Sequence, residues 1–428
     1  MTILKPGDPN YKIALAALDR SAEPDPRVSE TVKEIIAGIR KRGDAALIEY
    51  TEKFGGPSLA AKQLRVRAAE FKAAEKRVDA RTREAVAVSH TNVREFAEKS
   101  LRKSWSGKNR QGAKVGERFD PFERVGIYVP GGTAPLVSTA VMTCTLAAAA
   151  GVPQIVVTTP ADKSGAVNPA LLYALSVAGA TEVYKAGGAQ AVAAMAYGTE
   201  SIERVLKIFG PGNAYVVEAK RQCFGRVAID LLPGPSEILV IADATANAAW
   251  IAADLLAQAE HGHGSVVLFV TDSAGKLKEV EAAFEEQLGK LDRQEHLREV
   301  ADRTTHLILL KNLGEAVKLA NGFAPEHLTI VAAGDEELAA QIRTAGAIFL
   351  GGYSPVVAGD FVAGPSHELP TGGAGKSFPG LTVDQFQRRT SVVRLDRKSL
   401  GALLPAIRTF SEIEGLDAHG RSAEVRFE

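Results

Sequence analysis

The sequence of 428 residues has little cysteine, no net charge and no long unbroken apolar run. Its two cysteines, Cys144 and Cys223, cannot form a disulfide framework, which indicates a reducing compartment. The 51 basic residues balance 51 acidic ones, so a broad basic surface for nucleic acid or anionic lipid is excluded. The most apolar stretch, 134–159, is interrupted by Pro135 and Pro153 and is not a membrane span. We therefore expect a cytoplasmic protein.

Short β-branched runs alternate with Ala-rich helical stretches from residue 124 onward, a pattern typical of mostly parallel sheets. The first 120 residues and a short tail, 383–387 and 400–408, are expected to be helical. The fold class is α/β, with two Rossmann-like doubly wound domains and small helical N- and C-terminal segments. The expected strands are 125–129, 154–158, 182–185, 205–209, 227–230, 238–242, 266–270, 306–310, 328–331 and 347–350.

Three glycine-rich turns, 128–133, 187–190 and 210–213, each follow an expected strand and lead into a helix. Backbone amides at a helix N-terminus can hold a phosphate, and such turns gather where α/β sheets bind ligands. A purely geometric role for each turn remains open. Because the sequence has no G-x-G-x-x-G, any dinucleotide site must be non-standard.

Polar residues of metal-binding and catalytic type are scattered over the second half. Gln258 and His261, spaced i and i+3 at a helix end, can face one metal, although a capping or packed histidine is equally compatible. Glu326 and His327 are adjacent before a strand and can act as two separate bases. With Asp360 and His419, the residues Gln258 and His261 would form a nitrogen and oxygen donor set suited to zinc, but spacing alone does not bring them together.

At several motifs the sequence resembles the histidinol dehydrogenase family, in the family's order from about residue 28 to the C-terminus. The resemblance implies a homodimeric zinc enzyme that oxidises an amino alcohol to an amino acid through an aldehyde, with two NAD⁺. The motifs are Tyr128–Gly132, Gly187–Ala191, Gly210–Val216, Gly234–Glu237, Gln258–Gly262, Ala324–Leu328, Ser354–Pro355, Gly359–Asp360, His367–Thr371 and Glu414–Leu416 with His419.

The resemblance also implies roles for individual residues. His327 would take the alcohol proton and Glu326 would activate water for the aldehyde step. His419 would come from the partner subunit, so the active site would be shared across the dimer. The zinc ligands would be Gln258, His261, Asp360 and His419, and NAD would contact Tyr128, Gln190 and Asn213. The substrate would be surrounded by Ser236, Gln258, His261, His327, Asp360, His367, Glu414 and His419.

The implied domains follow from the same resemblance. Residues 1–23 would form an N-terminal extension, and 24–127 together with 236–378 the α/β domain with the metal and catalytic residues. Residues 128–235 would form the Rossmann-like domain that contacts NAD, and 379–428 a small helical domain exchanged across the dimer. The turn Leu232–Pro235 marks the expected crossover between the two strand series.

The implied activity is the NAD-dependent oxidation of L-histidinol to L-histidine, in histidine biosynthesis. Two departures accompany it: Val356-Val357 stands where the family commonly has Glu-Ser, and Ser366 where it commonly has Asn. A carboxylate lost at position 356 motivates an alternative, a paralogous zinc- and NAD-dependent dehydrogenase of another small hydroxylated compound.

Overall fold

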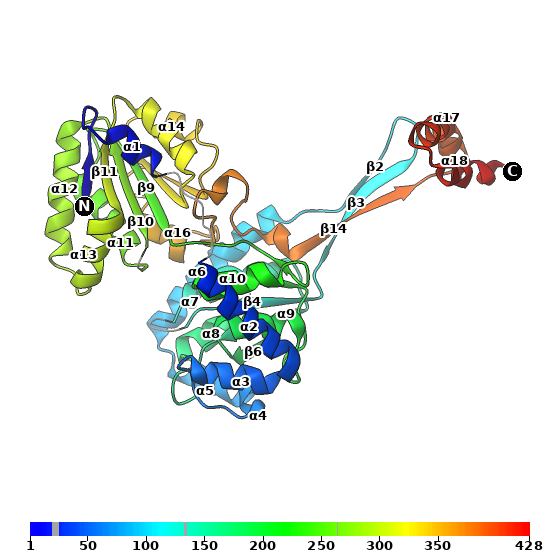
Figure 1. The fold of residues 1–428 in the computed structure, drawn as a ribbon, viewed down its shortest axis with the longest axis horizontal. Coiled ribbons are helices and arrows are strands. Elements are labelled where there is room, and N and C mark those ends of the chain that lie inside the picture. Colours follow the sequence, from blue (N-terminus) through cyan, green and yellow to red (C-terminus); the bar gives the residue numbers. More distant parts are fainter. Residues whose placement is uncertain (19–24, 132–134, 263) are drawn as a thin grey trace.

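The chain folds into two α/β lobes and a long arm that carries the C-terminus away from both (Figure 1). This arrangement comes from a computed structural model, which describes residues 1–18, 25–131, 135–262 and 264–428. Gly132 and Thr133 of the first glycine-rich turn, and His263, lie outside the described residues.

The first lobe is built on a five-stranded sheet in the order β6-β5-β4-β7-β8, with every pair parallel. Strand β4 is buried at every residue, as expected for a strand covered on both faces. The order reverses between β4 and β7, so the carboxyl ends of these two strands flank the crevice where open α/β sheets bind ligands. The strands are β4 (Arg124–Tyr128), β5 (Gln154–Thr159), β6 (Glu182–Lys185), β7 (Lys207–Phe209) and β8 (Ala228–Ile229).

Helices from two parts of the chain cover this sheet. Those that connect its strands are α7 (Val137–Ala149), α8 (Pro169–Val177), α9 (Gly188–Tyr197) and α10 (Ala214–Cys223). The N-terminal helices pack on them, α2 on α9 and α10, α5 on α8, and α6 on α7. The N-terminal helices are α2 (Pro26–Arg42), α3 (Asp44–Lys53), α4 (Ala61–Leu64), α5 (Ala68–Arg77) and α6 (Ala80–Ser100).

This packing differs from the expected grouping of residues 24–127 with 236–378. Val32, Ile35, Ile36 and Ile39 of α2 share a buried apolar cluster with residues of α9 and α10. The helical periodicity of this segment predicts its helices, but the sheet on which those helices pack depends on contacts with residues more than a hundred positions away. The N-terminal helices therefore belong with the first lobe.

The second lobe contains a six-stranded parallel sheet in the order β1-β11-β10-β9-β12-β13. Apart from β1, its order repeats that of the first sheet. Strand β1 pairs with β11, so the start of the expected 1–23 extension is part of this sheet. The strands are β1 (Thr2–Leu4), β9 (Glu237–Ala242), β10 (Val266–Thr271), β11 (Thr305–Leu309), β12 (His327–Val331) and β13 (Ala347–Leu350).

The chain passes from β8 of the first sheet to β9 of the second through the turn Leu232–Pro235, the segment where a crossover between the two series was expected. The helices of the second lobe cover both faces of its sheet. They are α1 (Tyr11–Ala16), α11 (Ala248–Ala259), α12 (Ala274–Leu288), α13 (Gln294–Thr304), α14 (Leu313–Phe323), α15 (Asp335–Ala339) and α16 (Val356–Phe361), followed by the 3-10 turn η1 (Ala374–Lys376). The 3-10 turn η2 (Val383–Phe386) packs against α6 and α7 of the first lobe.

The arm is an antiparallel sheet of β2 (Trp105–Lys108), β3 (Lys114–Pro121) and β14 (Gln387–Arg394), in the order β14-β3-β2. The expectation of helix through residue 120 is therefore wrong for 105–108 and 114–120, and the small helical segment expected at 379–428 also contains β14. Strands β3 and β14 are rich in charge and pair over about 270 positions, so no local pattern predicts that pairing, whereas β2 pairs with β3 across a short turn.

At the tip of the arm lie α17 (Arg397–Glu414), α18 (Asp417–Glu424) and the 3-10 turn η3 (Val425–Phe427), far from both lobes (Figure 1). Phe410 and Ile413 of α17 are exposed at 64% and 74%. Exposed apolar side chains gathered at one end of a molecule are typical of a contact surface. Among the described residues, none of the helices combines the length and apolar character needed to cross a bilayer.

Candidate active site

Glu326 and His327 lie at the amino end of β12, and both side chains are buried. The Glu326 carboxylate is held from the neighbouring strand β9. Its Oε2 accepts hydrogen bonds of 2.7 Å from the Ser236 hydroxyl and from the Glu237 backbone N–H. Ser236, expected to contact substrate, is thus a donor to the proposed base, and the start of one strand fixes the carboxylate at the start of the next.

The ring of His327 is oriented by a backbone carbonyl. Its Nδ1 lies 3.1 Å from the Glu237 carbonyl oxygen, which can only accept, so Nδ1 carries a hydrogen. Nε2 is then the basic nitrogen of the neutral ring. It lies 3.5 Å from Asp360 Oδ1 and has no hydrogen-bond partner at normal distance among the described residues. This nitrogen is the one able to take a proton from a bound molecule.

The buried charges shift one another's protonation. Burial raises the pKa of Glu326 to about 7. Burial alone would lower the pKa of His327, but the charges of Glu326 and Asp360 outweigh it and raise that pKa to about 9. The pKa of Asp360 is lowered despite its burial, because imidazoles surround it. A cation bound at Asp360 would offset that carboxylate's charge and bring the His327 pKa down toward neutrality.

Asp360 lies in α16, which packs against α11. Its Oδ2 is 3.9 Å from Nε2 of His261, which follows α11 by two residues. Gln258 lies in the last turn of α11, and the His261 backbone N–H bonds to its carbonyl. Three of the four expected metal ligands are therefore grouped where α11 ends.

The Gln258 side chain is 2% exposed, and neither amide atom has a hydrogen-bond partner among the described residues. An unpaired buried polar group costs about 1–3 kcal/mol, so a bound ligand is expected there. Amide oxygen, imidazole nitrogen and carboxylate oxygen suit zinc. Within the described ranges, no group of three or more His, Cys, Asp or Glu is placed to hold a metal, so the set needs the Gln258 amide and a donor from elsewhere.

His367 joins the two lobes at this site. Its Nδ1 lies 2.6 Å from the Asp360 carbonyl oxygen, and its Nε2 is 3.3 Å from the Thr139 hydroxyl of α7. The buried Glu368 carboxylate lies 3.4 Å from the same Nε2. Burial would lower the His367 pKa, but Glu368 and Asp360 raise it above its usual value.

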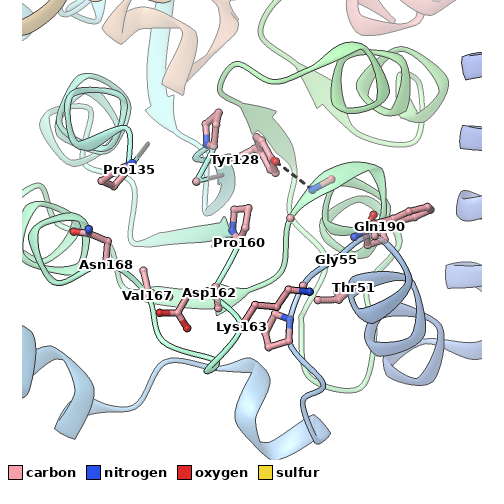
Figure 2. Close-up of a pocket in the computed structure, with 18 of the residues that line it drawn as sticks. Thr51, Gly55, Tyr128, Pro135, Pro160, Asp162, Lys163, Val167, Asn168 and Gln190 are labelled. Atoms are coloured by element: carbon pink, nitrogen blue, oxygen red, sulfur yellow. Dashed lines mark hydrogen bonds between the residues drawn. The ribbon is translucent and has the colours of Figure 1, made fainter. Parts of the chain in front are cut away.

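A cavity of about 1040 Å³ opens at the carboxyl ends of the first sheet. Its wall includes the three expected cofactor residues, Tyr128, Gln190 and Asn213, and parts of all three glycine-rich turns. In Figure 2, Tyr128 lies above Pro160, Gln190 lies to the right, and Lys163 lies below. The Gly188 N–H donates to the Tyr128 hydroxyl at 3.1 Å, which ties two of the turns together. The cavity lies at the crevice that the strand order predicts.

Glu414 and His419 lie apart from the other site residues. Glu414 ends α17 and His419 lies in α18, so both are at the tip of the arm (Figure 1), and both are exposed. Within one chain the structure does not bring them to Asp360 and His327.

Three supporting residues had no role in the sequence analysis. The Glu237 carbonyl orients His327, and its buried carboxylate accepts from the Gly372 N–H at 2.8 Å. Thr139 reaches His367 from the other lobe, and Glu368 lies against the same ring. The motif Gly234–Glu237 includes Glu237, but only the pairing of β9 with β12 reveals its role. No local sequence pattern indicates a role for Thr139.

Comparisons with known proteins agree with this geometry. A family model described as histidinol dehydrogenase matches residues 18–427. The chain belongs to the histidinol dehydrogenase family. The histidinol dehydrogenase of Syntrophotalea carbinolica is 43% identical over 427 residues, covering 100% of this chain and 99% of that protein. That of Agrobacterium fabrum is 45% identical over 411 residues, covering 96% and 95%.

A crystal structure of histidinol dehydrogenase from Elizabethkingia anophelis is also similar, with a TM-score of 0.95 and 36% identity, covering 100% of this chain and 98% of that one. The resemblance inferred from the motifs is thereby confirmed, as is the α/β fold class with mostly parallel sheets. Membership of the histidinol dehydrogenase family also fits the pairing of a cofactor-sized cavity with a buried acid and imidazole.

The unpaired Gln258 amide gives a test of the site without any assay of activity. In metal-free protein, Gln258→Met should raise the free energy of unfolding by about 1 kcal/mol, because an unsatisfied buried amide is replaced by an apolar chain of similar shape. Denaturant unfolding in the presence of chelator measures this change.

The matched control is Gln222→Met. The Gln222 amide donates to the Ser29 carbonyl at 2.8 Å and to Glu218 Oε1 at 2.7 Å, so its loss should destabilise by about 1 kcal/mol. A Gln258→Met protein as destabilised as the Gln222→Met protein would contradict an unpaired amide.

Proposed function

We propose that this protein oxidises L-histidinol to L-histidine in two NAD⁺-dependent steps, as an enzyme of histidine biosynthesis. The observation that carries the proposal is the buried Glu326–His327 pair beside the Gln258, His261 and Asp360 donor set. The family name of its relatives supplies the substrate. Two buried free cysteines suit a cytoplasmic location.

His327 is the base of the first step. Its Nε2 accepts the hydroxyl proton of the alcohol while the carbon-bound hydrogen leaves as hydride, so the alcohol becomes an aldehyde by loss of two electrons. The Glu237 carbonyl holds Nδ1–H and so keeps Nε2 directed at the substrate. Tyr128, Gln190 and Asn213 line the cavity and would hold NAD⁺, which would supply the hydride acceptor.

Glu326 is the base of the second step. Its ionised carboxylate takes a proton from water as the oxygen adds to the aldehyde carbon, and His327, protonated in the first step, returns its proton to the carbonyl oxygen, giving the hydrate. Hydride loss from that hydrate to a second NAD⁺, with one hydroxyl proton taken again by His327, leaves the acid group, which ionises to the carboxylate of the amino acid. Hydrogen bonds from Ser236 and Glu237 to Oε2 stabilise the ionised form, which burial opposes.

Gln258, His261 and Asp360 would hold a zinc ion whose fourth protein ligand is His419 of the partner subunit. A zinc ion held there would supply orientation of the substrate through its amine and imidazole groups. The negative charges of Glu326, Asp360 and the partner subunit's Glu414 favour a cationic amine, and His367 lies beside them. The exposed apolar face of α17 supports a homodimer in which each arm reaches the other subunit's site.

The alternative, a paralogous dehydrogenase of another hydroxylated compound, depended on the missing carboxylate at position 356. Val356 is 3% exposed and packs in the apolar core of the second lobe, in a cluster with residues of α11. A side chain at position 356 therefore joins α16 to the apolar core of the second lobe. The substitution therefore gives no reason to prefer another substrate.

Separate assays of the two steps test the proposal. Wild-type protein should oxidise both histidinol and its aldehyde. Glu326→Gln should slow the aldehyde step by at least about 100-fold while the alcohol step falls by less than about tenfold, and His327→Asn should abolish the alcohol step. Because water activation needs the ionised carboxylate, the wild-type aldehyde rate should rise with pH through about 7. Equal loss of both steps in Glu326→Gln would contradict the division of roles.

Subunit mixing tests the shared site. His261→Ala and His419→Ala proteins should each be inactive. After random exchange half of the dimers are mixed, and each has one intact site of two, so about a quarter of wild-type activity should return. Mass spectrometry of the mixture verifies exchange. Mixed dimers without activity would show that each site is made from one chain.

A further inference from the structure

A fully enclosed ion pair lies next to the cofactor cavity without lining it. Lys220 of α10 and Asp230, the residue after β8, have side-chain exposures of 0% and 1% and are paired with each other. Neither has a part in the chemistry above. A buried ion pair is weak evidence for stability, because the cost of removing both charges from water offsets their attraction.

The Lys220–Asp230 pair hydrogen-bonds to the backbone of a single glycine, Gly210. Lys220 Nζ donates to the Gly210 carbonyl at 2.8 Å, and the Gly210 N–H donates to Asp230 Oδ2 at 2.8 Å. Gly210 is the buried residue at which the chain leaves β7 for the turn to α10. Its backbone groups would otherwise need other partners inside the protein. Two opposite charges thus fix both polar groups of a single residue.

Gly210 in turn lies against one expected cofactor residue, Tyr128, and three positions before another, Asn213. It has φ +107°, and an added Cβ would lie 2.1 Å from the Tyr128 carbonyl oxygen, so the turn lies directly against the end of β4. Three residues on, Asn213 caps α10 through Oδ1, which accepts from the Tyr215 and Val216 N–H groups. This leaves Nδ2 as the part of Asn213 that can bind a ligand.

The contacts continue to the third cofactor residue. The Tyr128 hydroxyl accepts from the Gly188 N–H at the start of α9, which carries Gln190 (Figure 2). Tyr128 and Gly210 also lie on either side of the point where the strand order reverses. All three cofactor residues are therefore linked, through short contacts, to the position of Gly210.

We propose that Lys220 and Asp230 are positioning residues for the cofactor: by holding both backbone groups of Gly210 they set the placement of Tyr128 and Asn213 that NAD⁺ requires. The identity of the cofactor rests on the proposed function. Pre-ordering a binding turn removes an entropic cost of association, so loss of the pair weakens binding more than it alters the chemistry.

The chain offers a matched control at the other end of the same sheet. Arg124, at the start of β4, donates from Nη1 to Glu182 Oε1 at 2.7 Å, and these side chains are 6% and 17% exposed. This pair is also largely enclosed, but it lies at the amino ends of the strands, whereas the cavity opens at their carboxyl ends.

The test compares Lys220→Met/Asp230→Leu with Arg124→Met/Glu182→Met in the full-length, zinc-loaded protein. Isothermal titration calorimetry gives the Kd for NAD⁺, and steady-state assays give KM and kcat. For the first variant we expect Kd and KM for NAD⁺ to rise at least about tenfold while kcat changes less than about threefold. For the control variant, Kd for NAD⁺ should stay within about twofold of the wild-type value, even if its Tm falls as much as that of Lys220→Met/Asp230→Leu.

Asp230→Asn is the closest variant in shape, because it removes the carboxylate charge but keeps an oxygen for the Gly210 N–H; its Kd should rise about threefold or more. Near-wild-type Kd values in Asp230→Asn, or in the folded double variant, would overturn the positioning role. Wild-type protein that binds NAD⁺ without oxidising histidinol would contradict the proposed substrate alone. Wild-type protein that does not bind NAD⁺ would overturn both proposals.

Discussion

The structure depends on keeping two carboxylates and an imidazole ionisable inside a protein interior. The buried His327 ring lies 3.5 Å from the Glu326 carboxylate and 3.5 Å from the Asp360 carboxylate, distances at which charges in a poorly solvated site interact strongly. Backbone groups of Glu237 and the Ser236 hydroxyl compensate part of the lost hydration. The same burial that makes the cluster costly raises the Glu326 pKa toward neutrality, where a carboxylate is a useful base.

The two sheets have the same strand order but present opposite ends of their strands to the proposed site. The first presents the carboxyl ends of β4 and β7 to the cavity, as open α/β sheets usually do. The second presents the amino ends of β9 and β12, where Ser236 and Glu326 lie. Thr139 contacts His367 across the boundary, so a helix of the cofactor lobe touches the reaction lobe. This arrangement explains why neither lobe has a complete site alone.

Most strands of both sheets could be predicted, because β-branched runs between helical stretches are a local signal; 182–185 and 347–350 match their strands at both ends. The arm could not, since β3 and β14 are charged and paired only over long range. Motifs predicted roles for Glu326, His327, Tyr128, Gln190 and Asn213, but not for Lys220 and Asp230, whose partner is the backbone of Gly210. The sheet on which residues 24–127 pack likewise could not be predicted from local sequence patterns.

The central claim is that one site carries out both oxidations of histidinol. Counting NADH against histidinol consumed by purified, zinc-loaded protein tests it most directly, with the free aldehyde trapped and measured in parallel. We expect two NADH for each histidinol, no aldehyde above trace amounts, and loss of turnover with chelator that zinc restores. One NADH for each histidinol with release of aldehyde, or no NADH at all, would contradict it.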